Sequence, residues 1–552
     1  MDRVPEHNLH SVAFPVLDDA QIAQLAGCVK VAPMHYPSGE TLIRVGDRTM
    51  KFFIVLSGEI EIIDHSGDQP KTIVTHSRGQ FNGDISYLTG TPAIVSAIAR
   101  GDCQVIEISQ DALRQVLNQC PVLSDIILQA FIARRQLLRE SPDFVGLRVI
   151  GSRYSADTFR VRDFLARNRV LFTWVDVETD PLVDQMLSAF GVTAADTPVV
   201  ACSHMLLLRN PSNQQLADEI GIHQPLTHVV YDLLVVGAGP AGLGAAVYGA
   251  SEGLRTAVLE STGPGGQAGS SMRIENYLGF PTGLTGAELT DRATLQASKF
   301  GASLSVPSLA TGLSFVNGYP TVVLDDGETI TTKCLLIATG AQYRRLDVEG
   351  FERFEGTGVY YAATPMEGSL CRGCSVIVVG GGNSAGQAAV FLAGQARNVL
   401  LVIRGDDLSK NMSSYLVRRI AQTANIELLC NTSVRHVEGN SHLQSVDIVD
   451  GRNGQTRRVE TPAVFSFIGA TPRTDWLPAE IERDAKGFVL TGPALKESPY
   501  WKPGRTPFLL ETSHPGVFAA GDVRSGSSKR VAAAVGEGSM AVQFVHEYLR
   551  QM

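Results

Sequence analysis

One stretch near the middle of the chain limits the possible folds more than any other. Residues 231–236 are a short apolar run, which is typical of a strand buried on both faces. Gly237, Gly239 and Gly242 end this run, and small side chains at helical spacing follow them. A second apolar run then ends on Glu260. The order of strand, glycine turn, helix, strand and acid predicts a β-α-β unit with a phosphate-binding turn.

Each part of this unit has a role in binding a dinucleotide. The first glycine permits a tight turn, the second lets a pyrophosphate approach the backbone, and the third lets the helix pack closely on the strand. The N-terminus of the helix offers free N–H groups to the phosphates, and an acid about 20 residues further on accepts the ribose hydroxyls. The residues predicted to hold this first dinucleotide are Gly237, Gly239, Pro240, Ala241, Gly242 and Glu260.

Length, charge and cysteine content set the broad class of protein. A chain of 552 residues is too long for one hydrophobic core, so about three or four domains are expected. The formal net charge of −9 gives no reason to expect nucleic acid or a membrane as a partner. The N-terminal residues lack a basic start followed by an apolar core, so we expect no signal peptide. The 8 cysteines do not make a disulfide framework in so long a chain, which favours the cytoplasm.

Residues 12–140 are predicted to form a first domain. Short strand-like runs alternate with glycine turns, and helical stretches flank them, which predicts a small β-roll. The predicted strands are 41–43, 52–56, 59–63, 72–75 and 105–108, and the predicted helices are 18–26 and 112–139. Four short segments of this domain resemble the cyclic-nucleotide-binding domain of catabolite activator proteins and cyclic-nucleotide-gated regulators. These segments are 52–58, 79–81, 83–85 and 90–92.

The first domain departs from that family where the ligand is bound. The resemblance implies a Glu for the ribose and an Arg for the cyclic phosphate, but this chain has Asp84 and Ala93 at those positions. Without the guanidinium, a buried phosphate loses its bidentate, charge-matched partner. We therefore expect no cyclic nucleotide. The domain is either a sensor for another ligand or a fold kept for packing or dimerisation.

Residues 146–222 are predicted to form a second, small α/β unit. The predicted strands are 147–150, 171–177 and 197–200, and the predicted helices are 159–167, 182–190 and 215–220. This order, with Pro198 after Thr197 in a bond that is a candidate for the cis form, is similar to glutaredoxins. Those proteins carry Cys-x-x-Cys before the first helix, whereas this chain has Ser155 and Thr158. Because a hydroxyl does not replace a thiolate in disulfide exchange, a spacer or docking domain is expected rather than a redox relay. Residues 224–228 are expected to be a linker.

From Tyr231 onward, several motifs follow one another in the order used by low-molecular-weight thioredoxin reductases, which this part of the chain resembles. The resemblance implies an FAD domain made of residues 230–346 and 475–552. It also implies that Asp522 holds the flavin ribityl chain and that a basic residue, Arg530, lies near the flavin. A homodimer is expected on the same ground. The further FAD contacts implied are Gly266, Gln267, Asn276, Ala338, Thr339, Gly340, Gly521, Asp522, Arg530 and Val531.

A second nucleotide fold, residues 347–474, interrupts the FAD domain. A buried strand at 376–379 is followed by a glycine turn and a helix rich in small residues. The next strand, 400–403, ends on Arg404. An acid at that point accepts ribose hydroxyls, whereas an Arg suits a 2′-phosphate, so NADPH is favoured over NADH. The residues predicted in this turn are Gly380, Gly382, Asn383, Ser384 and Ala385.

Other charges near the end of that strand complicate the choice of nicotinamide. Lys410 is the nearest further cation, and we predict that it assists Arg404. Asp406 and Asp407 lie between the two and weaken the case for a phosphate, so NADH stays possible.

The position of the catalytic dithiol is the main departure from the thioredoxin reductases. That family carries Cys-x-x-Cys after an aromatic residue shortly before the second nucleotide fold. Here Tyr361 is followed by Ala362 and Pro365 at the two cysteine positions, and Met366 replaces the acid that usually follows.

A different Cys-x-x-Cys pair, Cys371 and Cys374, lies within ten residues. This spacing can close a strained, reducible disulfide, and Arg372 between the two favours the thiolate. One interpretation is that the dithiol has moved and that these two cysteines are catalytic. The other is that they are ordinary residues of a turn. A zinc site is not expected, because no second Cys or His pair lies at ligand spacing.

Together these observations predict an α/β protein. Two Rossmann-like three-layer domains, for FAD and NAD(P), follow a β-roll and a small thioredoxin-like α/β domain. The expected function is an FAD-dependent NAD(P)H oxidoreductase that passes hydride from NADPH to FAD and on to a disulfide, a small redox protein or another acceptor. The resemblance implies that the two nucleotide domains rotate about segments 346–350 and 470–474. Alternatives are a dithiol-free flavin reductase resembling ferredoxin–NADP reductases, and a sensor of redox state or of a ligand.

Overall fold

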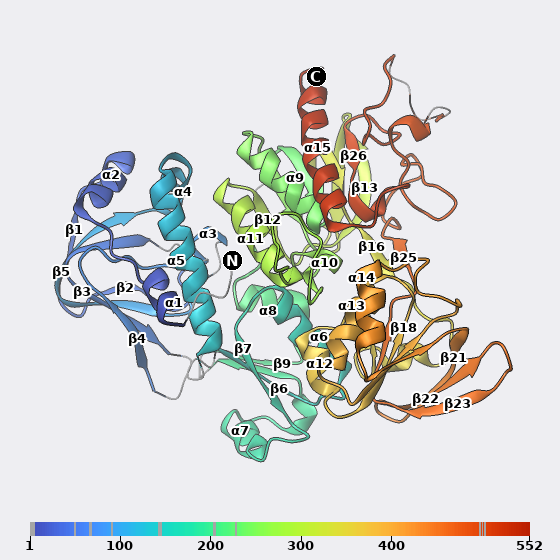
Figure 1. Ribbon diagram of the computed structural model, residues 1–552. Helices are drawn as coiled ribbons and strands as arrows, with labels where there is room; N and C mark the ends of the chain where they lie inside the picture. The colour runs from blue at the N-terminus through green and yellow to red at the C-terminus, as the bar shows by residue number, and fades with distance from the viewer. Residues whose placement is uncertain are drawn as a thin grey trace.

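The computed structural model describes most of the chain, and four units are distinct in it (Figure 1). The described residues are 6–48, 51–65, 69–84, 86–89, 92–141, 146–202, 206–226, 229–495, 498–499, 501 and 504–552. Three residues of the segments that resemble the cyclic-nucleotide-binding domain, Ile85, Gly90 and Thr91, and two of the predicted linker, Thr227 and His228, lie outside the described residues.

The N-terminal unit is a β-roll, as predicted, closed by helices on one side. Its antiparallel sheet has the order β1-β5-β3-β4, and β2 pairs with β5. The strands are β1 (Met34–Tyr36), β2 (Thr41–Ile43), β3 (Phe52–Asp64), β4 (Lys71–His76) and β5 (Ser96–Ile108). The helices are α1 (Glu6–Ala13), α2 (Asp19–Val29), α3 (Ser86–Thr89), α4 (Gln110–Gln119) and α5 (Pro121–Glu140).

Two details of the β-roll differ from the sequence prediction. The turn predicted between residues 52–56 and 59–63 is wrong, because both runs belong to the single strand β3, whose pairing with β5 shifts register around Ser57. Gly58 has a φ of 77° there, so it bends the strand without ending it. The helical stretch predicted at 112–139 is two helices, α4 and α5, because Pro121 has no N–H with which to continue α4.

The small α/β unit has a four-stranded sheet in the order β7-β6-β8-β9. β6 and β7 are parallel and the other pairs are antiparallel. The Thr197–Pro198 bond is cis, and β9 is a strand that the sequence analysis did not predict. The strands are β6 (Leu147–Gly151), β7 (Phe172–Asp176), β8 (Val199–Cys202) and β9 (Leu206–Arg209). The helices are α6 (Ala156–Arg167), α7 (Val183–Ala189), η1 (Ala194–Asp196) and α8 (Asn213–Glu219).

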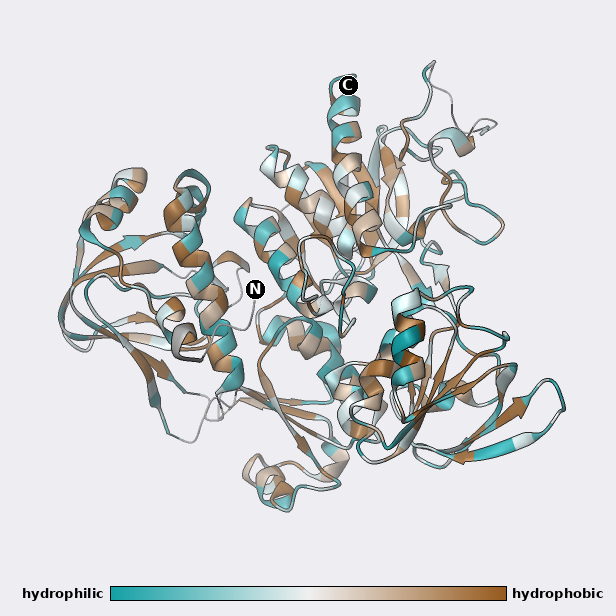
Figure 2. Ribbon diagram, in the orientation of Figure 1, coloured by the Kyte–Doolittle hydropathy of each residue, from teal (hydrophilic) through white to brown (hydrophobic). Residues whose placement is uncertain are grey.

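The first Rossmann-like domain has a mixed sheet in the order β12-β11-β10-β15-β14-β13, and β26 pairs with β15. The strands are β10 (Tyr231–Val236), β11 (Thr256–Leu259), β12 (Ser303–Ser305), β13 (Ala310–Val316), β14 (Tyr319–Leu324), β15 (Thr329–Ile337) and β26 (Val517–Ala519). The helices are α9 (Pro240–Ser251), α10 (Gly266–Gly269), α11 (Gly286–Lys299), η3 (Gly492–Leu495), η4 (Gly521–Val523) and α15 (Val531–Leu549). The apolar strands and the helices that cover them form the core (Figure 2).

The second Rossmann-like domain has a parallel sheet in the order β17-β24-β18-β19-β20. An antiparallel sheet, β21-β22-β23, packs beside it and was not predicted from the sequence. The strands are β17 (Val359–Tyr360), β18 (Ser375–Val379), β19 (Asn398–Val402), β20 (Ile426–Leu429), β21 (Thr432–Gly439), β22 (Leu443–Asp450), β23 (Thr456–Glu460) and β24 (Val464–Ser466). The helices are η2 (Phe351–Phe354), α12 (Pro365–Leu370), α13 (Asn383–Ala393) and α14 (Ser414–Gln422).

The chain crosses between the two Rossmann-like domains twice, and the two crossings pair with each other. β16 (Ala341–Tyr343) and β25 (Ala470–Pro472) form an antiparallel ribbon. We call this pair of strands the crossing ribbon. β25 occupies the first part of the predicted hinge 470–474, and β16 ends shortly before the predicted hinge 346–350.

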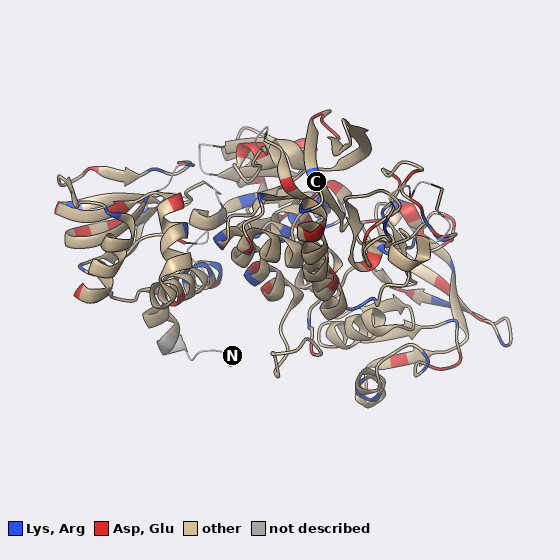
Figure 3. Ribbon diagram, turned by 90° about the horizontal axis from the view of Figure 1, so that it is seen from above, with Lys and Arg blue, Asp and Glu red and all other residues tan. Residues whose placement is uncertain are grey.

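In Figure 1 the small α/β unit lies below the first Rossmann-like domain, between the β-roll and the second Rossmann-like domain. The β-roll also contacts the first Rossmann-like domain, because Leu295 of α11 is part of the β-roll core and Asn118 donates a hydrogen bond to the Lys299 carbonyl. Charged side chains of both signs are distributed over all four units (Figure 3). In the part of the chain that the structure describes, no helix is long and apolar enough to cross a membrane.

Candidate functional site

A single cavity of about 2070 Å³ extends across the two Rossmann-like domains. Both predicted phosphate turns line it, and so does the crossing ribbon. The predicted cofactor residues that line it are Gly237, Gly239, Pro240, Ala241, Glu260, Gly266, Gln267, Ala338, Thr339, Gly340, Gly380, Gly382, Asn383, Ser384, Ala385, Arg404, Gly521, Asp522, Arg530 and Val531. The predicted residues that lie outside this lining are Gly242, Asn276, Lys410, Cys371 and Cys374.

The first phosphate turn has the geometry that a pyrophosphate requires. Gly237 has a φ of 108°, which favours glycine. A Cβ added to Gly242 would lie 1.8 Å from the Gly237 carbonyl oxygen, so this glycine is needed for the helix to pack on the turn. A Cβ added to Gly239 would meet no atom within 4 Å, so the space above this backbone is open. The turn therefore fits a phosphate group at the N-terminus of α9.

Glu260 is held in a fixed orientation at the edge of this turn. One carboxylate oxygen accepts the Ala238 N–H at 2.8 Å, and the other accepts the Thr262 N–H at 3.0 Å. Oε1 of Glu260 also accepts from the Gly263 N–H and the Ser261 hydroxyl, each at 3.4 Å, whereas Oε2 accepts only the Ala238 N–H among the described residues, so Oε2 keeps capacity for a ribose hydroxyl.

The second phosphate turn repeats this geometry at the N-terminus of α13. Gly380 has a φ of 141°, and a Cβ on Gly382 would meet no atom within 4 Å. Arg404 is exposed and lines the cavity, and within the described chain its guanidinium takes part in no hydrogen bond or ion pair. Lys410 instead donates to Asp406 at 2.7 Å and lies outside the cavity lining. Arg404 is thus the predicted cation that faces the nucleotide site.

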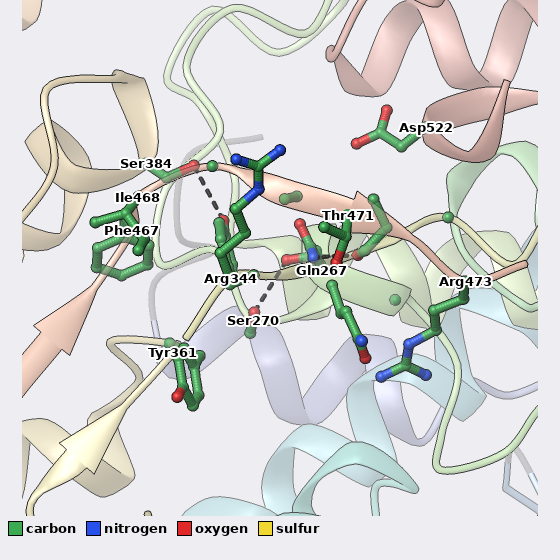
Figure 4. Close-up of a pocket in the computed structure, with 18 of the residues that line it drawn as sticks. Gln267, Ser270, Arg344, Tyr361, Ser384, Phe467, Ile468, Thr471, Arg473 and Asp522 are labelled. Atoms are coloured by element: carbon green, nitrogen blue, oxygen red, sulfur yellow. Dashed lines mark hydrogen bonds between the residues drawn. The ribbon is translucent and has the colours of Figure 1, made fainter. Parts of the chain in front are cut away.

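A third helix N-terminus also meets the cavity. Asp522 lies in η4, which leads into the loop before α15, and its carboxylate projects toward the same hollow as Gln267 and Ser384 (Figure 4). Burial raises the pKa of the Asp522 carboxyl, and Lys529 is close enough to donate to the Asp522 carbonyl at 2.5 Å. α15 begins at Val531 directly behind this loop. The N-termini of α9, α13 and α15 therefore all open on one cavity, where each favours an electron-rich group.

The crossing ribbon connects the two predicted nucleotide sites. The Tyr343 hydroxyl donates to Ser384 Oγ at 3.1 Å, across from one Rossmann-like domain to the other. Gln267 donates from its side-chain amide to the Ala341 carbonyl on the same ribbon. The structure therefore places one residue of each predicted site in hydrogen-bonding contact with the same strand, β16 (Figure 4).

Comparison with known proteins agrees with this geometry. The profile of the pyridine nucleotide-disulphide oxidoreductase family matches residues 231–538, and that of the cyclic nucleotide-binding domain matches residues 33–120. The chain belongs to the pyridine nucleotide-disulphide oxidoreductase family. Thioredoxin reductase of Treponema pallidum is 33% identical over 319 residues, which are 58% of this chain and 97% of that protein. The enzyme from Mycolicibacterium smegmatis is 34% identical over 315 residues, 57% of this chain and 95% of that protein.

A solved structure of this oxidoreductase family is similar over the same region. Thioredoxin reductase of Lactococcus lactis, in its FR conformation, has 27% sequence identity and a TM-score of 0.52, and the match covers 58% of this chain and 100% of that one. The chain is therefore an oxidoreductase of the thioredoxin-reductase type with additional N-terminal units.

This oxidoreductase has no cysteine at the two positions where the resemblance to thioredoxin reductases predicts the catalytic pair. The structure shows the surroundings of the residues that stand there. Ala362 lines the cavity beside Tyr361, whose hydroxyl donates to Glu355 at 2.7 Å. Pro365 is the first residue of α12, whose N-terminus is capped by Thr364. Of the two positions expected to carry the dithiol, the first therefore lies in the cavity wall and the second is the first residue of a helix.

Cys371 and Cys374 lie at the far end of α12. Cys371 has 0% exposure in the core of the second Rossmann-like domain, and burial raises the pKa of its thiol to about 12. Cys374 is partly buried in the turn before β18. Among the described residues, no group of His, Cys, Asp or Glu is arranged to hold a metal ion.

The small α/β unit supplies a wall of the cavity that sequence reasoning missed. Four residues of α6 line it, namely Ala156, Phe159, Asp163 and Arg167. The Phe159 ring lies 5.5 Å from the Tyr360 ring, centroid to centroid. A Cβ added to Gly356 would be 3.5 Å from the Ala156 Cα. Contacts between segments that are far apart in the chain produce no local sequence pattern, so this wall could not be predicted from the sequence.

This wall brings together two places that the sequence analysis treated separately. Ala156 lies between Ser155 and Thr158, the positions that the sequence analysis compared with the cysteines of glutaredoxins, and it packs beside the segment that leads to Ala362. Ala156 and Ala362, one residue from each of these two segments, therefore line the same cavity, and neither segment carries the expected cysteines.

Proposed function

We propose that this chain is an FAD-dependent oxidoreductase that takes hydride from NADPH and passes the electrons to an acceptor without a dithiol relay. The observation that carries this proposal is the single cavity that both phosphate turns and the crossing ribbon line. A flavin, when bound, accepts two electrons from a nicotinamide and donates them to the next acceptor. The task of the chain is to hold both nucleotides in one hollow and to exclude water.

The residues of the first Rossmann-like domain fit FAD. The N–H groups at the start of α9 would hold the pyrophosphate, and the open space above Gly239 leaves room for it. Glu260 would accept the ribose hydroxyls, since its carboxylate is already oriented by two backbone N–H groups. Asp522 would bind the ribityl chain, and the N-terminus of α15 would stabilise negative charge on the flavin ring.

The residues of the second Rossmann-like domain fit a nicotinamide dinucleotide. The N–H groups at the start of α13 would hold its pyrophosphate. Arg404 supports NADPH over NADH, because its guanidinium is exposed at the cavity and forms no ion pair within the described chain.

Two observations support an acceptor other than a protein disulfide. Burial holds Cys371 in its thiol form, and only a thiolate attacks a disulfide. In addition, α6 of the small α/β unit already covers the cavity beside Ala362, which is the position of the family's dithiol. A small redox molecule that enters the cavity is therefore the acceptor that the geometry favours.

The Cys-x-x-Cys spacing of Cys371 and Cys374 supports a second candidate, a disulfide reductase with a relocated dithiol. Their thiols are close enough for Cys374 to influence the pKa of Cys371. In that case the two cysteines would be catalytic and a small redox protein would be the partner.

An anaerobic NADPH titration of the holoprotein, followed by flavin absorbance, tests the proposal. We expect about one NADPH per FAD for full reduction, because only the flavin stores electrons. Consumption of about two would place a disulfide in electronic contact with the flavin and favour the second candidate. Absence of reduction by both NADPH and NADH would overturn both.

Titration of two double variants distinguishes the two candidate functions further. The double variant Cys371→Ser/Cys374→Ser should leave the stoichiometry unchanged under our proposal and should lower it under the second candidate. The double variant Ala362→Cys/Pro365→Cys restores cysteine at the family positions and serves as the positive control, which should raise the consumption toward about two NADPH per FAD.

A further inference from the structure

A second cavity, of about 350 Å³, lies in the β-roll between the sheet and helix α5. Its volume is at the lower end of the range of small-molecule sites, which is about 300–1,000 Å³. Most of the surface that the cavity exposes is apolar, although polar residues also line it, and its aliphatic side chains include Ile43, Ile62, Val74, Ala97, Leu137 and Leu138. The residues come from strands β2 to β5 and from α5, so the fold itself encloses the space.

The cations at this cavity are already engaged. Arg134 is 7% exposed and donates to the carbonyls of Ala13, Phe81 and Gly83 at 2.6–2.8 Å. Its guanidinium also lies over the rings of Phe14 and Phe81, 5.3 and 4.8 Å from their centroids. The Arg134 guanidinium therefore stabilises the wall of the cavity through contacts within the protein.

The other charged groups also disfavour an anionic ligand. Lys71 lies directly across the β3–β4 pair from Asp64, a carboxylate only 5% exposed. Asp84 adds a second carboxylate and accepts from Arg135 at 3.1 Å. Ala93, in the place expected for a phosphate-binding Arg, contributes only a methyl group. A cyclic phosphate would meet two carboxylates and no available cation among the described residues.

One polar group in the lining has no partner. His76 is 2% exposed, and its Nδ1 has no hydrogen-bond partner in the part of the chain that the structure describes. Burial lowers the pKa of His76 to about 3, so the ring is neutral at physiological pH. A buried polar atom without a partner is costly, and a ligand group that bonds to it recovers that free energy.

We propose that this cavity binds an uncharged, largely apolar small molecule with one hydrogen-bonding group that His76 recognises. The aliphatic lining supplies the binding free energy, and His76 supplies selectivity between ligands of the same shape. A cyclic nucleotide, which carries a full negative charge, does not fit this chemistry.

The test uses the full-length, FAD-loaded protein and two neutral bicyclic probes of similar size, 2-naphthol and 2-methylnaphthalene. Both should bind in calorimetric titrations, and cyclic AMP should not. The variant His76→Phe keeps a planar aromatic ring at this position but removes both ring nitrogens. We expect the ratio of the two dissociation constants to shift by about tenfold in this variant, at the expense of 2-naphthol.

A second variant locates the binding. Ala97→Leu fills the cavity from β5 and should abolish binding of both probes, whereas NADPH oxidation should be unchanged. If circular dichroism shows that Ala97→Leu is not folded, the proposal is judged on the ratio of the two dissociation constants in His76→Phe. Failure of both probes to bind the wild-type protein, an unchanged ratio in His76→Phe, or displacement of 2-naphthol by cyclic AMP would each overturn the proposal. Because the nucleotide cavity is not involved, these outcomes are independent of the proposed function.

Discussion

Arg169 of the small α/β unit forms an ion pair with Asp291 on α11 of the first Rossmann-like domain. Both side chains are only about a quarter exposed, at 25% and 28%. The Arg169 carbonyl in turn accepts a hydrogen bond from Arg135 of α5 at 2.8 Å, and Arg135 binds Asp84 of the β-roll. One continuous series of contacts therefore joins the cavity of the β-roll to the helix that packs beside the predicted FAD site.

We predict that Asp291→Asn loosens the small α/β unit from the cavity that it covers. The variant should lose up to about 1 kcal/mol of the docking free energy, because the ion pair is partly screened by solvent. Hydrogen exchange of α6 should become faster, and NADPH oxidation by dissolved oxygen should increase as the flavin becomes more accessible. Asp325→Asn, at an exposed turn of the same domain, is the matched control. Unchanged exchange in α6 would show that the pair does not hold the unit in place.

Gly239→Ala and Gly242→Ala should separate cofactor binding from folding. The added methyl group at position 239 meets no protein atom, so the apoprotein should keep its stability while FAD binds more weakly. At position 242 the methyl group would lie 1.8 Å from a backbone oxygen, so both FAD retention and thermal stability should fall. Gly536→Ala, at an exposed and open position of α15, should have neither effect. Flavin content after gel filtration and the melting temperature report the two properties.

Arg404→Ala should raise the KM for NADPH by about tenfold or more and leave the KM for NADH unchanged, since a charge-assisted hydrogen bond contributes about 1.5–3 kcal/mol. Lys410→Ala should change neither value, because Asp406 already binds this lysine. Steady-state kinetics with both nucleotides provide the measurement. Equal effects of the two substitutions, or a parallel loss with NADH, would contradict the assignment of Arg404 to a 2′-phosphate.

The thiols of Cys371 and Cys374 should react at very different rates. At pH 8 iodoacetamide should modify Cys374 in the native protein and Cys371 only after unfolding, because the pKa of Cys371 is raised to about 12. Since the folded state binds this proton more tightly than the unfolded state, the stability that it contributes is complete below pH 9 and is lost between pH 9 and 12. Peptide mass spectrometry after timed labelling gives the order, and early modification of Cys371 would favour the redox-pair interpretation.

The two phosphate turns could be predicted from the sequence because their requirements are local. Gly237 and Gly380 adopt backbone angles that favour glycine. The helices α9 and α13 begin a few residues after these glycines, as the spacing of each turn predicts. The strand and helix order of both Rossmann-like domains follows from apolar runs a few residues long. The replacement of the family's dithiol by Ala362 and Pro365 is likewise visible in the sequence alone.

Other features depend on residues that are far apart in the chain. The burial that suppresses Cys371 comes from the packed core of the second Rossmann-like domain, and the unpartnered nitrogen of His76 depends on how α5 closes the β-roll. The sequence by itself determined where the two phosphate turns lie, because turn geometry and helix N-termini depend on residues that are close together in the chain. Only the tertiary structure decided that α6 walls the cavity and that Arg404, rather than Lys410, faces it, because packing between distant segments and the choice among ion-pair partners are settled in the folded chain.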